Sequence, residues 1–178
     1  VAGYEADDVI GTLATEAGRQ GIITYMMTPD KDYGQLVSDK VFMYRPKHTG
    51  GFEVMGVDEV KAKFDIQSPA QVIDMLGLMG DSSDNIPGCP GVGEKTAQKL
   101  IAEFGSIENL LEHTDQLKGA LKTKVETNRE MITFSKFLAT IKIDVPIQLD
   151  MDSLVREQAD EDSLRQIFEE LEFRTLID

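Results

Sequence analysis

Seven acidic residues lie in three tight groups, each at the edge of an apolar segment, and they constrain the fold more than any other feature. The groups are Glu5, Asp7 and Asp8; Asp30 and Asp32; and Asp81 and Asp84. Carboxylates repel one another, so a fold that aims several at one place requires cations between them. Each group taken alone also fits a helix cap or a solvated turn. Their joint occurrence favours a site for hard ions such as Mg²⁺ or Mn²⁺, which prefer oxygen ligands.

The first part of the chain alternates helix and strand signals. Apolar residues at helical spacing predict a helix over 7–18, whose first turn holds Asp7 and Asp8. The apolar run 22–28 predicts a strand buried on both faces and ended by Pro29. Asp30 and Asp32 would then follow the carboxyl end of that strand, the edge where ligands gather in open α/β sheets.

A hairpin and a series of helices complete the predicted organisation. Strands at 41–44 and 52–55 are joined by a glycine-containing turn. The predicted helices cover 58–64, 69–79, 94–104, 106–111 and 117–138, and a last helix starts at 160–162 after an extended stretch at 145–149. The chain therefore divides into an α/β part over 1–67 and a helical part over 68–178.

The segment from Gly88 to Leu100, GCPGVGEKTAQKL, is the most specific single motif. Gly91 and Gly93 permit positive φ and close backbone approach, and the helix that follows offers free amides to an anion. Lys95 and Thr96 add a charge and a hydroxyl, and Lys99 extends the basic track. A Walker loop is excluded because its GxxxxGK[ST] spacing is absent. The segment predicts a grip on a phosphate backbone, with a structural helix–turn–helix joint as the alternative.

The net charge of −14 argues against a nucleic-acid partner, but the uneven distribution of the charge along the chain weakens this argument. From residue 86 to 142 eight Lys and Arg face seven Asp and Glu. The single cysteine, Cys89, excludes an internal disulfide and predicts a reducing cytoplasm. No apolar run approaches the roughly 20 residues that cross a membrane. The chain opens at Val1 without an initiator Met, which predicts that it is a piece of a longer protein.

Four motifs together resemble the 5′→3′ exonuclease domain of bacterial DNA polymerase I, which is similar to the flap endonucleases. They are GYEADDVIGTLA, TPDKD, MGDSSDNIPGCPGVGEKTA and LEFRTLI, in this order along the whole chain. The resemblance implies a PIN-like parallel-sheet α/β domain followed by an all-α domain with a helix–three-turn–helix element. It also implies hydrolysis of DNA phosphodiesters near a 5′ end or 5′ flap, in primer removal and repair.

The resemblance assigns a role to each group of residues. Glu5, Asp7 and Asp8 would bind mainly the first of two metal ions, and Asp30, Asp32, Asp81 and Asp84 would serve the second ion and the bridging region. Gly91, Gly93, Lys95 and Thr96 would hold the duplex backbone. Main-chain carbonyls over 86–92 would hold a monovalent cation such as K⁺.

The resemblance also marks what lies outside this sequence. Upstream strands with further aspartates and a helical arch belong to the family pattern, so the chain alone is expected to hold an incomplete site. Proofreading-like and polymerase domains would follow in the parent protein, a bacterial cytoplasmic, nucleoid-associated enzyme. Two alternatives stay open: a non-catalytic helix–hairpin–helix DNA-binding module, and a phosphoacceptor or phosphatase fold with Asp30 or Asp32 as nucleophile.

Overall fold

The computed structural model describes residues 1–47 and 49–176, so His48 of the predicted hairpin turn lies outside the described residues. It contains two compact units, Val1–Gln148 and Leu149–Asp178. The predicted boundary between 1–67 and 68–178 is a different division, made by fold type, and it stays a prediction.

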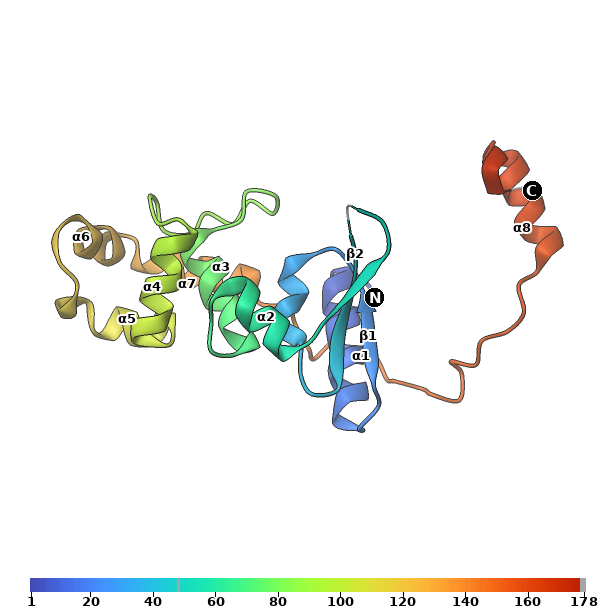
Figure 1. Cartoon of the computed structure of the whole chain (residues 1–178), viewed down its shortest axis with the longest axis horizontal. Coiled ribbons are helices and arrows are strands. Elements are labelled where there is room, and N and C mark those ends of the chain that lie inside the picture. Colours follow the sequence, from blue (N-terminus) through green and yellow to red (C-terminus); the bar gives the residue numbers. More distant parts are fainter. Residues whose placement is uncertain (48, 177–178) are drawn as a thin grey trace. The chain divides into compact units, whose positions relative to one another are not determined.

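The first unit begins with a small mixed sheet (Figure 1). Helix α1 (Ala6–Arg19) precedes strand β1 (Thr24–Met27), the 3-10 helix η1 (Lys31–Leu36), and strands β2 (Val41–Pro46) and β3 (Phe52–Met55). The strand order is β1-β2-β3, with β1 parallel to β2 and β2 antiparallel to β3. The predicted α/β class, the parallel strand pair and the hairpin are confirmed.

The prediction of a first strand buried on both faces is wrong. Met26 is buried, but Tyr25 and Met27 on the opposite face are 55% and 72% exposed. Helix α1 packs against β1 and β2, whereas the aromatic ring of Tyr25 stacks on Phe42 with centroids 5.6 Å apart. The apolar run is continuous because the second face carries an aromatic ladder, and not because a second layer of described residues covers it.

The remaining regular elements of the first unit are helices. They are α2 (Val57–Phe64), η2 (Pro69–Gln71), α3 (Val72–Met79), α4 (Glu94–Phe104), α5 (Ile107–Glu112), η3 (Thr114–Gln116), α6 (Gly119–Thr127) and α7 (Arg129–Ala139). Helix α4 ends at Gly105, whose φ of 80° is a conformation that glycine adopts without a Cβ penalty. The predicted bounds of α4 match the structure residue for residue.

The single helix predicted over 117–138 is wrong, because the chain breaks it at Asn128. Leu117 and Lys118 precede the first helical residue, Gly119. The Asn128 side-chain amide donates to the Lys124 carbonyl at 2.8 Å, and the Asn128 backbone leaves the helical region at φ −112° and ψ 20°. A side chain that bonds the local backbone competes with helix continuation. The break lets α7 turn back and pack along α3.

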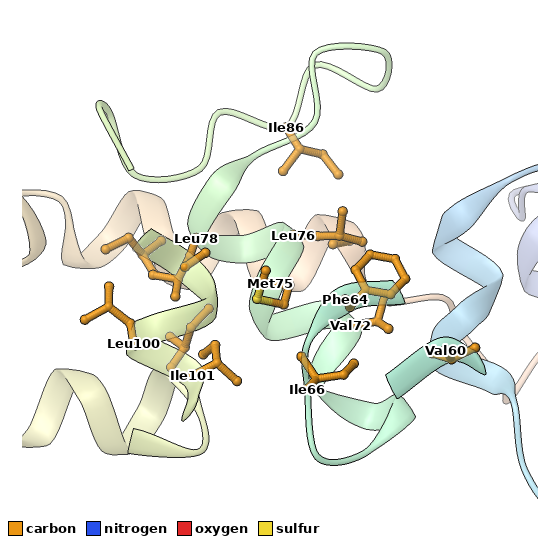
Figure 2. Packing of buried hydrophobic residues seen from close by; sticks show 14 of the residues in the cluster. Val60, Phe64, Ile66, Val72, Met75, Leu76, Leu78, Ile86, Leu100 and Ile101 are labelled. Carbon is orange, nitrogen blue, oxygen red and sulfur yellow. The ribbon is translucent and has the colours of Figure 1, made fainter. Parts of the chain in front are cut away.

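The core of this unit is formed mainly by α3 and the elements around it. Val72, Met75 and Leu76 are fully buried, and α4 contributes Leu100 and Ile101. Figure 2 shows these side chains together with Phe64 and Val60 of α2 and with Ile86, which comes from the loop after α3. Ile86 therefore ties that loop to the same core that fixes α3.

The second unit is short and contains α8 (Glu161–Glu170) and η4 (Arg174–Leu176). The Asp160 carboxylate accepts a hydrogen bond from the Ser163 amide at 3.0 Å, which caps α8 where the acidic cluster predicted a helix start. No helix within residues 1–47 and 49–176 has the length and apolar character of a membrane span.

Candidate metal centre and duplex-binding hairpin

The first acidic group lies at the start of α1. Glu5 is the N-cap residue, and Asp7 and Asp8 are in the first turn. Both oxygens of Asp8 accept backbone hydrogen bonds, from the Glu5 amide at 3.2 Å and from the Lys142 amide at 2.9 Å. Asp7 accepts a hydrogen bond from the Tyr33 hydroxyl at 2.8 Å. Asp8 is therefore a genuine capping residue as well as a member of the acidic group.

The second acidic group follows β1. Asp30 caps η1, and its Oδ1 accepts a hydrogen bond from the Asp32 amide at 3.0 Å. Asp32 is only 7% exposed, and its Oδ1 accepts no hydrogen bond from the described residues. Burial raises the pKa of Asp32 to about 6, against the opposing charge of Lys31, and the neighbouring charges of Asp30 and Asp81 add to the increase.

The third acidic group lies on a closed loop after α3. The backbones of Asp81 and Ile86 exchange hydrogen bonds of 2.9 and 2.8 Å, and Asp81 Oδ1 accepts from the Ser83 amide at 2.8 Å. Two glycines at positive φ, Gly80 and Gly88, close the base of the loop with their backbones in contact. A Cβ on Gly88 would lie 2.4 Å from the Gly80 nitrogen. The loop conformation therefore depends on this pair of glycines.

The fold brings all three acidic groups to one place. A cavity of about 260 Å³ is lined by Glu5, Asp7, Asp8, Asp30, Asp32 and Asp84, with Ile86 and residues 138–141 on the remaining side. Asp81 joins the same cluster, because oxygens of Asp32, Asp81 and Asp84 lie within 4.8 Å of one another. All seven predicted acidic residues are thus neighbours in space, while their individual roles stay predictions.

Lys31 is a member of this site that the sequence analysis missed. Its ammonium forms an ion pair and hydrogen bond with Asp81 Oδ2, and it lies 3.3 Å from Asp32 Oδ1. Burial opposes the charge of Lys31, yet the bond to Asp81 and the charge of Asp32 raise its pKa. Burial also disfavours ionised Asp81, but the hydrogen bonds from Lys31 and Ser83 hold the pKa of Asp81 below its usual range. The only sequence signal was a lysine between two aspartates.

Tyr33 is the second residue that was missed as a site member. It is 4% exposed, and both its burial and its hydrogen bond to Asp7 raise the pKa of its phenol. The hydroxyl therefore stays a donor to Asp7 at ordinary pH. A tyrosine six positions after a strand end gives no signal of this kind, because the contact joins residues 26 positions apart.

The donor set suits a hard divalent cation. All seven side chains offer carboxylate oxygens, and the buried Oδ1 of Asp32, which accepts no hydrogen bond from the described residues and has only the Lys31 ammonium at 3.3 Å, is an acceptor that a metal cation would satisfy. Without a cation, like charges at this spacing are offset only by Lys31 among the described side chains within 4 Å. The arrangement can hold metal ions beside an apolar wall formed by Ile86 and Leu138.

The glycine hairpin holds its predicted residues at the surface. Buried Cys89 and Val92 anchor the turn, Gly91 has a φ of 75°, and Lys95 and Lys99 are exposed on α4. Gly93 does not use the positive φ that glycine permits: with φ −100° and ψ 179° it is the extended N-cap residue of α4. Its carbonyl accepts from Thr96 and Ala97, so the first two helical amides have no acceptor within the helix. The hairpin therefore presents amides and lysines together.

Comparison with known families matches almost the whole chain. Residues 1–65 match the N-terminal resolvase-like domain of the 5′-3′ exonucleases, and residues 67–162 match their C-terminal SAM fold. The chain is 45% identical to DNA polymerase I of Bacillus subtilis and 43% identical to thermostable DNA polymerase I of Thermus filiformis. Each alignment covers 98% of the chain and 20% of the relative, so the chain spans about one fifth of these proteins.

Solved structures share the fold. T5 5′-exonuclease with bound zinc superposes with a TM-score of 0.70 at 23% identity, over 78% of this chain and 51% of that one. The catalytic core of Rad2 in complex with a DNA substrate gives a TM-score of 0.58 at 18% identity, over 92% of this chain and 56% of the other. Because both identities are below 25%, these superpositions show the fold alone: an α/β part with a small mixed sheet, followed by a helical part.

Proposed function

Because this chain belongs to the 5′-3′ exonuclease family, we propose that it provides part of the metal-dependent 5′-nuclease site of a bacterial DNA polymerase I. The proposed reaction is hydrolysis of a DNA phosphodiester at a 5′ end or a 5′-flap junction, in primer removal and repair. The observation that carries the proposal is that seven carboxylates from three separate chain segments lie together, six of them lining one cavity and the seventh, Asp81, beside Asp32 and Asp84. Helix capping alone gives no reason for the three segments to meet.

Two Mg²⁺ or Mn²⁺ ions are the proposed cofactors. Glu5, Asp7 and Asp8 would hold the first, and Asp30, Asp32, Asp81 and Asp84 would hold the second and the region between them. Bound divalent ions polarise a phosphodiester and lower the pKa of water. The chain itself keeps the ligands in place: Tyr33 orients Asp7, the Lys142 amide orients Asp8, and the Gly80–Gly88 contact fixes the loop of Asp81 and Asp84.

The hairpin is the proposed grip on double-stranded DNA. The outermost amides of α4, the hydroxyl of Thr96 and the exposed Lys95 and Lys99 would contact phosphates, which position a duplex without reading its sequence. Gly91 and Gly93 would allow the backbone to approach. Carbonyls over 86–92 are the proposed ligands of K⁺, and one of them, that of Gly91, lies 3.4 Å from the Lys124 ammonium.

The proposal extends to the parent protein. The proposed domain boundary lies at residues 67/68; the first family match ends at residue 65 and the second begins at residue 67. The relatives are bacterial DNA polymerases I, so downstream proofreading-like and polymerase domains and a cytoplasmic, nucleoid-associated location are part of the proposal.

Cleavage of a 5′-labelled flap duplex with and without Mg²⁺ tests this function, using the 178-residue chain and the full-length protein that carries it. We expect junction-length products from the full-length protein, lost in Asp81→Asn and Asp84→Asn variants that still bind the duplex. Lys122→Met, which removes an exposed ion pair on α6, serves as the matched control. Normal cutting by both Asn variants would show that the metal assignment is wrong. Duplex binding with no specific Mn²⁺ site and no cleavage by either protein would establish the binding-module alternative.

A further inference from the structure

The acidic cluster already contains one cation of the protein's own. The Lys31 ammonium bonds Asp81 and lies 3.3 Å from the otherwise unpartnered Oδ1 of Asp32. These two carboxylates and Asp84 form the only set of at least three His, Cys, Asp or Glu side chains with metal-binding geometry among the described residues. The ammonium therefore lies against the same oxygens that a divalent ion would require.

A divalent ion and Lys31 exclude one another at this position. Oxygens of Asp32, Asp81 and Asp84 lie within 4.8 Å of one another, so an ion bound among them would stand within a few ångströms of the ammonium. Two cations at that distance in a half-buried site repel strongly. Lys31 has a route out, because it is the first residue of η1 and its side chain is 35% exposed.

We propose that Lys31 is a built-in counter-ion, which neutralises Asp32 and Asp81 in the metal-free protein and leaves when a divalent ion binds. This inference rests on the proposed metal centre and deepens it. It assigns a reason for a lysine inside an otherwise acidic site: the ammonium keeps the three-segment cluster assembled without metal. It also makes binding of the second ion an exchange of cations, so Lys31 lowers the affinity for that ion.

Mn²⁺ titration of the protein, followed by calorimetry and by the electron paramagnetic resonance of free Mn²⁺, tests the exchange. We expect Lys31→Met to bind Mn²⁺ at the site of Asp32, Asp81 and Asp84 about tenfold more tightly than wild type, because the competing charge is gone. Lys31→Arg keeps the charge and should stay near wild type, and Lys122→Met should equal wild type. Metal-free Lys31→Met should melt at a lower temperature, and Mn²⁺ should restore it. Unchanged or weaker Mn²⁺ binding by Lys31→Met would overturn the proposal.

A second measurement needs no variant. Amine acetylation of the wild-type protein, quantified at each lysine by mass spectrometry, should modify Lys31 several-fold faster with saturating Mg²⁺ than without it, while Lys122 serves as the internal reference. Equal or slower modification of Lys31 with Mg²⁺ would contradict the exchange. If Mn²⁺ binds and the flap is cut, but Mg²⁺ does not speed the modification of Lys31, only the counter-ion inference fails. If Mn²⁺ does not bind at all, the proposed metal centre fails with it.

Discussion

The hydroxyl of Tyr33 donates a 2.8 Å hydrogen bond to Asp7 and so joins the turn after β1 to the first turn of α1. This bond connects two of the three acidic groups through a buried ring. It fixes the direction in which Asp7 presents its other oxygen to the cavity. Because a phenol with a raised pKa stays protonated, the bond persists across the pH range in which carboxylates are ionised.

Tyr33→Phe tests this orientation. We expect Mn²⁺ affinity to fall about tenfold, in line with the usual effect of removing a hydrogen bond to a metal ligand, while the free energy of unfolding falls by only about 1 kcal/mol. Calorimetric titration and urea unfolding measure the two quantities. Tyr4→Phe is the control, because the Tyr4 hydroxyl bonds no acidic residue in the described part of the chain. Equal Mn²⁺ affinity in Tyr33→Phe and wild type would mean that the bond does not orient a ligand.

The contact between Gly80 and Gly88 predicts a separate effect on stability. Gly88→Ala adds both positive-φ strain and a Cβ 2.4 Å from a backbone nitrogen, whereas Gly105→Ala has a similar φ with no atom within 4 Å. We expect Gly105→Ala to cost about 1–2 kcal/mol of unfolding free energy and Gly88→Ala about 2 kcal/mol more. Urea denaturation compares them. Similar costs for the two variants would show that the loop of Asp81 and Asp84 tolerates a different base.

The hairpin lysines are expected to act through charge. Lys95→Gln and Lys99→Gln should each weaken duplex binding for all sequences and reduce the slope of log affinity against log salt by about 1. Fluorescence anisotropy over a salt series measures this slope. Lys47→Gln, on the exposed turn after β2, is the matched control and should change neither quantity. An equal effect of Lys47→Gln would indicate a diffuse electrostatic attraction rather than a grip by the hairpin.

A buried ion pair away from the site predicts a pH dependence of stability. Lys136 of α7 bonds buried Asp74 of α3 at 2.6 Å and Glu108 of α5 at 2.8 Å. Burial disfavours the charged forms of both Lys136 and Glu108. The hydrogen bonds between Lys136 and its two acidic partners nevertheless raise the pKa of Lys136 above 10.5, and the bond from Lys136 lowers the pKa of Glu108 below 4.5. The stabilisation from Lys136 is therefore lost as the pH rises through its folded pKa. That from Glu108 is lost as the pH falls through its own.

Lys136→Met should accordingly cost about 3 kcal/mol near neutral pH, mostly because Asp74 keeps a buried charge without its partner. The difference from wild type should shrink towards both pH extremes. Urea unfolding across the pH range measures it, and Lys122→Met should cost much less, because its pair with Glu126 is exposed. A difference that does not vary with pH would show that Lys136 contributes through packing alone.

The sequence predicted those elements whose signals are local. Helix α4 carries its own start and stop in Gly93 and Gly105, and its buried residues recur at helical spacing, so its bounds were correct. The break at Asn128 was missed because it depends on one side-chain bond to Lys124 and on the packing of α7 along α3. The exposed face of β1 was missed for a related reason, since apolar residues do not reveal whether a second layer covers them.

The residues of the candidate site also fall into those with local sequence signals and those without. The acidic groups were identifiable because strand ends and helix starts are local features, and the resemblance placed them together. Lys31 and Tyr33 were not identifiable, because their contacts join residues 50 and 26 positions apart. Their contribution depends on which carboxylate each one reaches, and only the folded chain determines that.

The most direct test of the account is a count of Mn²⁺ ions bound specifically by wild type and by Asp84→Asn. We predict that Asp84→Asn binds one ion fewer than wild type, because the ion at Asp32, Asp81 and Asp84 is lost, and that its circular dichroism spectrum equals that of wild type. Identical Mn²⁺ binding by the two proteins, or no specific binding by wild type, would contradict the claim that the three acidic groups converge to form a metal centre.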